Sequence, residues 1–115
     1  MKERLTPQMA QASLARSGRR EFVSLFRHGS LEIEFYKPDG IDLQQPHERD
    51  EVYVVIAGSG QFVKGTERVQ FQPGEILFVP ARTEHHFENF TDDFATWVFF
   101  YGPDGGERTG GKPTE

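Results

Sequence analysis

Cysteine is absent from the 115-residue chain. Its absence excludes a disulfide framework, a thiolate metal site and a cysteine nucleophile. Long hydrophobic runs are also missing, since no apolar stretch approaches the roughly 20 residues that a membrane span needs. A signal-peptide hydrophobic region is not found in the opening MKERLTPQMAQ. We therefore expect a cytoplasmic protein that has no membrane partner.

Basic charge is in short supply as well. The chain has 13 Lys and Arg against 18 Asp and Glu, which gives a formal net charge of -5. A phosphate backbone is bound by a positive surface, so we expect no nucleic-acid partner. The sequence also lacks a G-x-S-x-G elbow, a phosphate-binding glycine loop and an H-E-x-x-H helix motif. Any metal must be held by histidine, carboxylate or amide side chains.

The chain does have many short segments with a period of two. In LEIEF, Leu31, Ile33 and Phe35 fall on one face and Glu32 and Glu34 on the other, which is typical of a half-buried strand. The same logic applies to the segments EFVSLF, DEVYVVIA, QFVKG, RVQFQ, EILFVP, HHFENF and FATWVFFY. Short strands, regular turns and no long helical pattern predict an all-β fold, an antiparallel sandwich or jelly-roll β-barrel.

Three parts are expected along the chain. Residues 21–102 form the barrel as one compact domain. Residues 1–20 form an N-terminal extension with at most a short helix, for which Thr6 is the N-cap and Pro7 lies in the first turn. Residues 103–115 are rich in Gly and Pro, so we expect a flexible tail.

A group of polar side chains stands at the head of one strand. Side chains two apart on a strand point the same way, so Gln45, His47 and Glu51 are expected on one face. His85 and His86 are adjacent and face opposite sides of an extended segment, so that one of them looks inward. Two imidazoles and one carboxylate suit Fe(II), Mn, Ni or Zn, and the amide of Gln45 can complete one side. The pattern predicts one divalent transition metal ion.

At these residues the chain resembles the cupin superfamily. The first cupin motif, G-x5-H-x-H-x3,4-E-x6-G, is matched by Gly40, Gln45, His47, Glu51 and Gly58. Gly40 and Gln45 are separated by one residue fewer than the motif has, and Gln45 replaces its first histidine.

The second motif, G-x5-P-x-G-x2-H-x3-N, appears as GEILFVPARTEHHFEN. It is matched by Gly74, Pro80, His85 and Asn89, and Arg82 stands where the motif has glycine. Both motifs occur in order and on predicted strands.

The resemblance, which is greatest to small single-domain bacterial cupins, implies a jelly-roll barrel with a metal inside. It implies that Gln45, His47, Glu51 and His85 are the ligands, with His86 at the surface or against a neighbouring subunit. Proteins of this type commonly pair through sheet edges, and the hydrophobic density of FATWVFFY also suggests a homodimer.

Alternatives remain open for individual residues. His47 and Glu51 can form an ordinary salt bridge at the start of a strand. Gln45 can hydrogen-bond a metal-bound water without touching the metal. Tyr53 can orient a substrate or simply fill the barrel, and Arg82 can clamp an anionic substrate or be solvated. Candidate residues for a substrate pocket are Tyr53, Phe35, Phe87, Arg82 and Trp97.

Three functions are compatible with these residues. The first is a metal-dependent dioxygenase, isomerase or lyase that acts on a small enolisable or carboxylate substrate. The second is a sensor or small-ligand-binding module without turnover, and the third is a structural cupin that has lost its metal. His47, Glu51 and His85 argue against the third. The catalytic residues cannot be assigned from the sequence, because fold membership does not select a reaction.

Overall fold

The eight expected strands are all present in the computed structural model, which describes residues 4–108. Its elements are α1 (Pro7–Ser17), β1 (Phe22–His28), β2 (Leu31–Tyr36), β3 (Asp50–Ala57), β4 (Gly60–Lys64), β5 (Glu67–Phe71), β6 (Ile76–Val79), β7 (His85–Glu88) and β8 (Ala95–Tyr101). The predicted all-β jelly-roll fold is confirmed.

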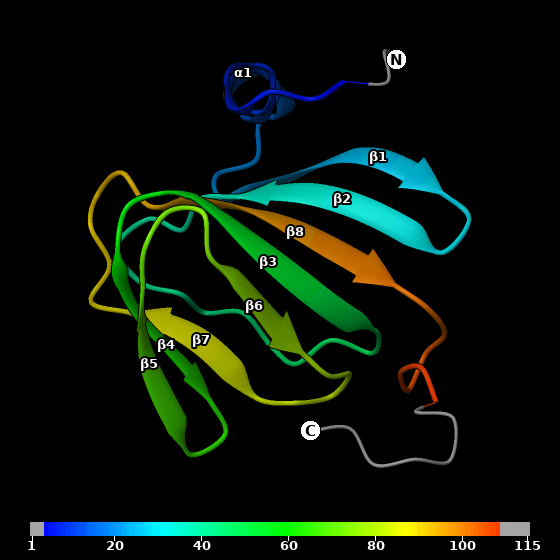
Figure 1. The fold of residues 1–115 in the computed structure, drawn as a ribbon. Helices are drawn as coiled ribbons and strands as arrows, with labels where there is room; N and C mark the ends of the chain where they lie inside the picture. Colours follow the sequence, from blue (N-terminus) through cyan, green and yellow to red (C-terminus); the bar gives the residue numbers. More distant parts are fainter. Residues whose placement is uncertain (1–3, 109–115) are drawn as a thin grey trace.

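The strands form two antiparallel sheets (Figure 1). A five-stranded sheet has the order β1-β2-β8-β3-β6, and a three-stranded sheet has the order β5-β4-β7. β8 therefore lies between β2 and β3, in the centre of the larger sheet. This position explains the hydrophobic density of FATWVFFY within a single chain. The homodimer stays a prediction. The exposed large apolar side chains on the described strands, which a second copy could contact, are Phe22, Val69, Ile76 and Phe78.

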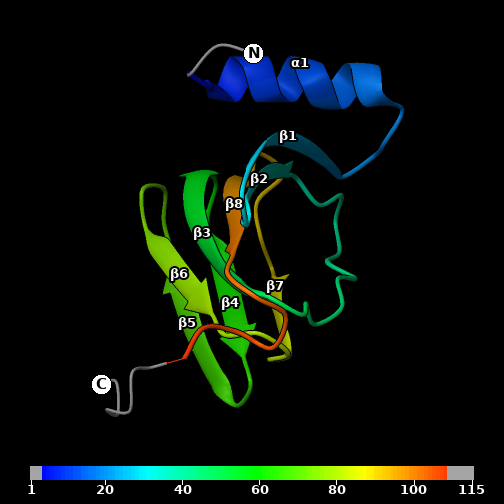
Figure 2. The same cartoon turned by 90° about the vertical axis from the view of Figure 1, so that its right-hand side faces the viewer.

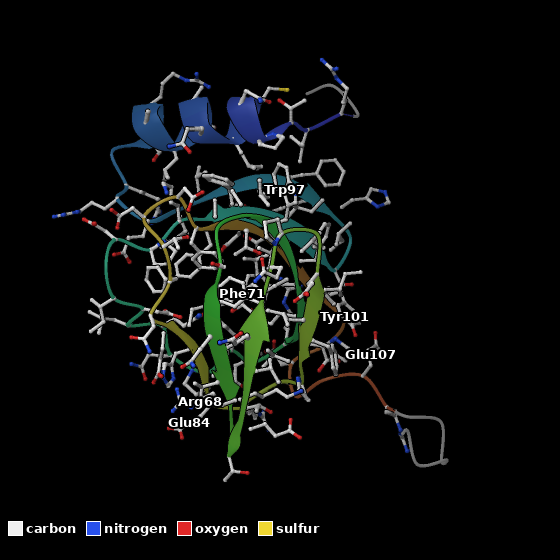
Figure 3. The ribbon with its side chains drawn as sticks, turned by 60° about the vertical axis from the view of Figure 1, so that its left-hand side comes forward. Arg68, Phe71, Glu84, Trp97, Tyr101 and Glu107 are labelled. Carbon is white, nitrogen blue, oxygen red and sulfur yellow. The ribbon has the colours of Figure 1, made fainter. Side chains whose placement is uncertain are left out.

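The main core fills the space between the two sheets. Alternating residues of the strands point into this space because side chains two apart on a strand share a face. Phe71 of β5, labelled in Figure 3, is fully buried in this core. The buried residues of this core are Tyr36, Tyr53, Val55, Phe62, Phe71, Val79, Phe87, Phe94, Val98 and Phe100.

The helix α1 covers the opposite face of the larger sheet (Figure 2). The Thr6 hydroxyl caps it by accepting a hydrogen bond from the Met9 N–H at 3.1 Å, and Gly18 ends it in the left-handed conformation. A second, smaller core lies under the helix and consists of Ala10, Leu14, Val23, Phe35 and Ala95, with Trp97 packed against it. Among the described residues no helix has the length and hydropathy to cross a membrane.

The chain beyond β8 folds back toward the start of β3. Asp50 is buried, and its two carboxylate oxygens accept hydrogen bonds from the N–H groups of Ala81 at 2.9 Å and Glu107 at 2.8 Å. This carboxylate ties the turn before β7 and the segment 103–108 to β3. Residues 109–115, the rest of the segment expected to be a flexible tail, lie outside the described residues.

Candidate metal centre

His47, Glu51 and His85 come together between the two sheets. One possible ligand atom from each side chain lies within 4.8 Å of the other two. Glu51 is on β3 of the larger sheet and His85 is on β7 of the smaller one, whereas His47 precedes β3. Two regions that are distant in sequence, the start of β3 with the loop before it and β7, thus supply one cluster.

Glu51 supplies the carboxylate of the cluster and is deeply buried, with 1% of its surface exposed. Its Oε1 lies 3.0 Å from Nε2 of His85, and its Oε2 has no hydrogen-bond partner among the described residues. A buried polar atom without a partner is costly, and a buried charge more so. A divalent cation beside Glu51 would remove this cost, so the donor set fits a metal ion.

The imidazole of His85 is held in one orientation. Nδ1 lies 2.8 Å from the carbonyl oxygen of Thr83, and because a carbonyl only accepts, Nδ1 carries the proton. Nε2 is then the nitrogen that faces Glu51, and in the neutral ring its lone pair is available to a metal ion, the arrangement usual for a metal-bound histidine. Burial alone would lower the pKa of His85, but the hydrogen bond and negative charge of Glu51 raise it above its ordinary value. His86 faces the other way and contacts Glu88 at 2.7 Å.

His47 is positioned by a loop rather than by a strand. β3 begins only at Asp50, so the alternation expected from Gln45 to Glu51 does not hold along this segment. The His47 ring packs against Phe100 with 4.8 Å between ring centroids. The backbone carbonyl of His47 accepts a hydrogen bond from the backbone N–H of Arg82 at 2.6 Å.

Gln45 is exposed, whereas the preceding residue, Gln44, reaches the site. Its Oε1 accepts a hydrogen bond from the hydroxyl of Tyr53 at 3.0 Å, and that hydroxyl also lies 3.0 Å from Nε2 of His85. Tyr53 is fully buried, and burial, followed by the charge of Glu51, raises its pKa well above the usual value. Tyr53 therefore fills the barrel and supplies a polar group to the site. Sequence reasoning missed Gln44, since the loop before β3 has no periodicity that selects it.

A cavity of about 570 Å³ gives access to the cluster. Glu34 of β2 lines it together with Val98 and Phe100 of β8. Burial, and then the neighbouring carboxylates Glu32 and Glu51, raise the pKa of Glu34 to about 7. The period-two pattern identified the two faces of β2, but not that the acidic face lines a cavity. That face turns inward because α1 covers the apolar one.

The remaining pocket candidates lie in different places. Phe35 and Trp97 pack under α1, on the face of the sheet away from the cavity, because α1 is the element that buries that face. Trp97 is labelled in Figure 3. Phe87 packs against Tyr53 with 4.9 Å between ring centroids. Arg82 is exposed and pairs with Glu48 at 2.8 Å, outside the wall of the cavity.

Several motif positions have a left-handed backbone. Arg82 has φ 65° and Asn89 has φ 51°, and the glycines at positions 58 and 74 have φ 84° and 86°. Because glycine adopts this region without steric cost, the motif glycine replaced by Arg82 meets a backbone requirement. The departure at Arg82 therefore concerns the turn conformation and leaves the ligand set intact.

We expect Glu34→Gln to stabilise the metal-free protein more at pH 8 than at pH 5. Folding raises the pKa of Glu34 from 4.5 to about 7, so the folded protein favours the protonated carboxyl group. The contribution of Glu34 to stability is therefore greatest below pH 4.5, and it is lost as the pH rises through about 7. Because Glu34 is only partly buried, solvent screening limits the gain at pH 8 to about 1 kcal/mol. Urea denaturation in a chelator at both pH values measures it. Glu67→Gln, at an exposed site on β5, is the control, and an equal change for both variants would contradict the prediction.

The fold and the cluster together define a class of protein. The chain matches the Cupin_2 family, described as the cupin domain, over residues 33–101, and it belongs to this family. An uncharacterized protein of Streptomyces coelicolor is 31% identical over 85 residues, which cover 72% of this chain and 81% of that protein.

Solved structures share the fold. A protein of Neisseria meningitidis has a TM-score of 0.67 at 18% identity, and the match covers 87% of this chain and 100% of that chain. A cupin superfamily protein of Desulfitobacterium hafniense has a TM-score of 0.63 at 19% identity, with 88% of this chain and 93% of that chain covered. The DMSP lyase DddQ of Ruegeria pomeroyi has a TM-score of 0.62 at 24% identity, and the match covers 86% of this chain but only 55% of the lyase.

Proposed function

We propose that the protein is a metal-dependent enzyme that moves a proton on a small enolisable carbonyl or carboxylate substrate, as a lyase or isomerase. The observation that carries the proposal is the unpaired, buried Oε2 of Glu51 beside the oriented Nε2 of His85. His47, Glu51 and His85 would hold one divalent transition metal ion. When bound, such an ion acts as a Lewis acid that polarises a carbonyl or carboxylate oxygen.

Proton transfer is assigned to Glu34. Its pKa of about 7 suits a general base or acid near neutral pH. Glu34 and Tyr53 both flank Val98 in the sheet, so their Cα atoms lie two strand spacings apart, or about 10 Å. A small substrate in the cavity can therefore contact the Glu34 carboxyl at one end and the cluster at the other.

The apolar part of the cavity wall has a different function from Glu34. Val98 and Phe100 line the cavity beside the cluster and keep water from the reacting atoms. The buried hydroxyl of Tyr53 offers a hydrogen-bonding group that can orient the substrate oxygen. The lyase of Ruegeria pomeroyi, at 24% identity, supports the fold alone, and the reaction class rests on the residues of the cavity.

A dioxygenase and a ligand sensor without turnover are the competing functions. Glu34 favours proton transfer over both, because neither oxygen insertion nor simple binding requires a carboxyl group with a pKa near neutrality.

The test combines metal analysis with hydrogen exchange. We expect the natively purified protein to contain one divalent transition ion per chain and to exchange carbon-bound hydrogen of small carbonyl acids for deuterium, followed by NMR. Glu34→Gln should keep the metal and lose the exchange. Oxygen uptake without exchange would indicate a dioxygenase, ligand binding without either would indicate a sensor, and protein that binds no metal would refute the proposal.

A further inference from the structure

Asp42 is a buried carboxylate outside the metal cluster, with 8% of its surface exposed. It belongs to the segment between β2 and β3, which runs along one side of the barrel (Figure 2). Oδ1 accepts hydrogen bonds from the Tyr36 hydroxyl at 2.5 Å and the Gln44 N–H at 3.0 Å. Oδ2 accepts from the Phe87 N–H at 2.8 Å and from Nε2 of Gln44 at 2.7 Å. This carboxylate fixes the loop to β2 and β7.

The contact with Asp42 decides which way the Gln44 amide points. A carboxylate only accepts hydrogen bonds, so the NH₂ group of Gln44 must face Asp42. The amide oxygen is then the atom that faces Tyr53, at 3.0 Å. An amide oxygen has no proton to donate, so the Tyr53 hydroxyl must be the donor in this contact.

The direction of the Tyr53 proton has a consequence at the metal cluster. With its proton committed to Gln44, the phenol oxygen turns its lone pairs toward Nε2 of His85, 3.0 Å away. In the neutral ring that nitrogen also carries a lone pair, because the one proton is then on Nδ1 against Thr83. Two lone pairs that face each other beside Glu51 need either a proton on Nε2 or a metal ion between them, and a bound ion would replace that proton.

We propose that Gln44, oriented by Asp42, is a positioning residue that turns the oxygen of Tyr53 toward the metal ion. The inference rests on the proposed metal site, and it gives a supporting role to Gln44, whereas the resemblance implies its neighbour Gln45 as a ligand. Gln44 acts through Tyr53 and does not itself touch the ion. Residues that orient a metal-facing group typically change metal affinity by about 10- to 100-fold when they are replaced.

The test is a double-mutant cycle on zinc affinity of the full-length protein, measured by competition with a chromophoric chelator. We expect Gln44→Leu to weaken zinc binding about tenfold in the parent. In the Tyr53→Phe background the same substitution should have no further effect, because the hydroxyl through which it acts is gone. Gln45→Leu is the matched comparison, since its side chain is exposed and makes no hydrogen bond within residues 4–108.

Each outcome decides the proposal. An equal loss of affinity from Gln44→Leu in both backgrounds would show that Gln44 acts only through the loop, and no loss in the parent would remove its role altogether. Either result overturns the inference and leaves the metal site standing. A parent protein that binds no zinc overturns both. Asp42→Asn is a second variant, expected to weaken zinc binding only when Tyr53 is present, with thermal denaturation to verify its folding.

Discussion

Replacing His85 with alanine is expected to reduce the metal content of the purified protein to background. The imidazole supplies one of three donors, and its loss leaves Glu51 and His47 to hold the ion. We expect affinity to fall by more than about 100-fold, since even residues that only support a ligand account for 10- to 100-fold. Elemental analysis and titration of the metal-free protein measure the effect. His86→Ala is the matched control, because His86 is adjacent but faces outward and contacts Glu88.

His47→Ala should behave like His85→Ala, and parental binding by both variants would disprove the assignment of the site. The pH gives an independent check. Since Glu51 raises the pKa of His85, a proton competes with the ion at higher pH than it would for an ordinary histidine. Metal loading should therefore fall as the pH is lowered through that raised value, and it should recover when the pH is restored.

Gly58→Ala is expected to destabilise the protein by about 3 to 5 kcal/mol, the sum of backbone strain and overpacking. Gly58 has φ 84°, and a Cβ there would lie 2.5 Å from Cα of Phe94 and 2.7 Å from Oγ1 of Thr91. The first of these atoms belongs to the backbone, so a side-chain rotation does not relieve the clash.

The midpoint of urea denaturation measures this loss of stability. Gly65→Ala is the control, because Gly65 also has a left-handed backbone, with φ 59°, but a Cβ there meets nothing within 4 Å. We expect it to cost about 1 to 2 kcal/mol from the backbone alone. Equal losses for the two variants would mean that the close approach of Phe94 to Gly58 has no energetic weight.

The strands could be predicted from the sequence because burial on one face leaves a period of two. The pattern cannot say which face meets another layer of the same chain. On β2 the apolar face, with Phe35, turns outward to α1, and the acidic face, with Glu34, turns into the cavity. For this reason the aromatic residue was expected in the pocket and the carboxyl group was not.

Glu51 and His85 belong to strands, where alternation predicts their direction, and His47 reaches the cluster from the loop before β3, whereas Gln45 of the same loop is exposed. Alternation was extended back to Gln45, although β3 begins at Asp50. Which glutamine of the pair approaches Tyr53 depends on the hydrogen bonds of Asp42, and these are tertiary contacts that no local pattern records.

The two faces of β2 also offer a practical route for laboratory evolution. A library that varies Glu32 and Glu34 changes residues that line the cavity, while Ile33 and Phe35 keep the outer face of the same strand constant. A complementary library at Ile33 and Phe35 samples the outer face of the strand, where Phe35 packs beneath the helix, without changing the residues that line the cavity. Alternate positions of one short strand thus allow selection for altered chemistry to be carried out separately from selection for stability.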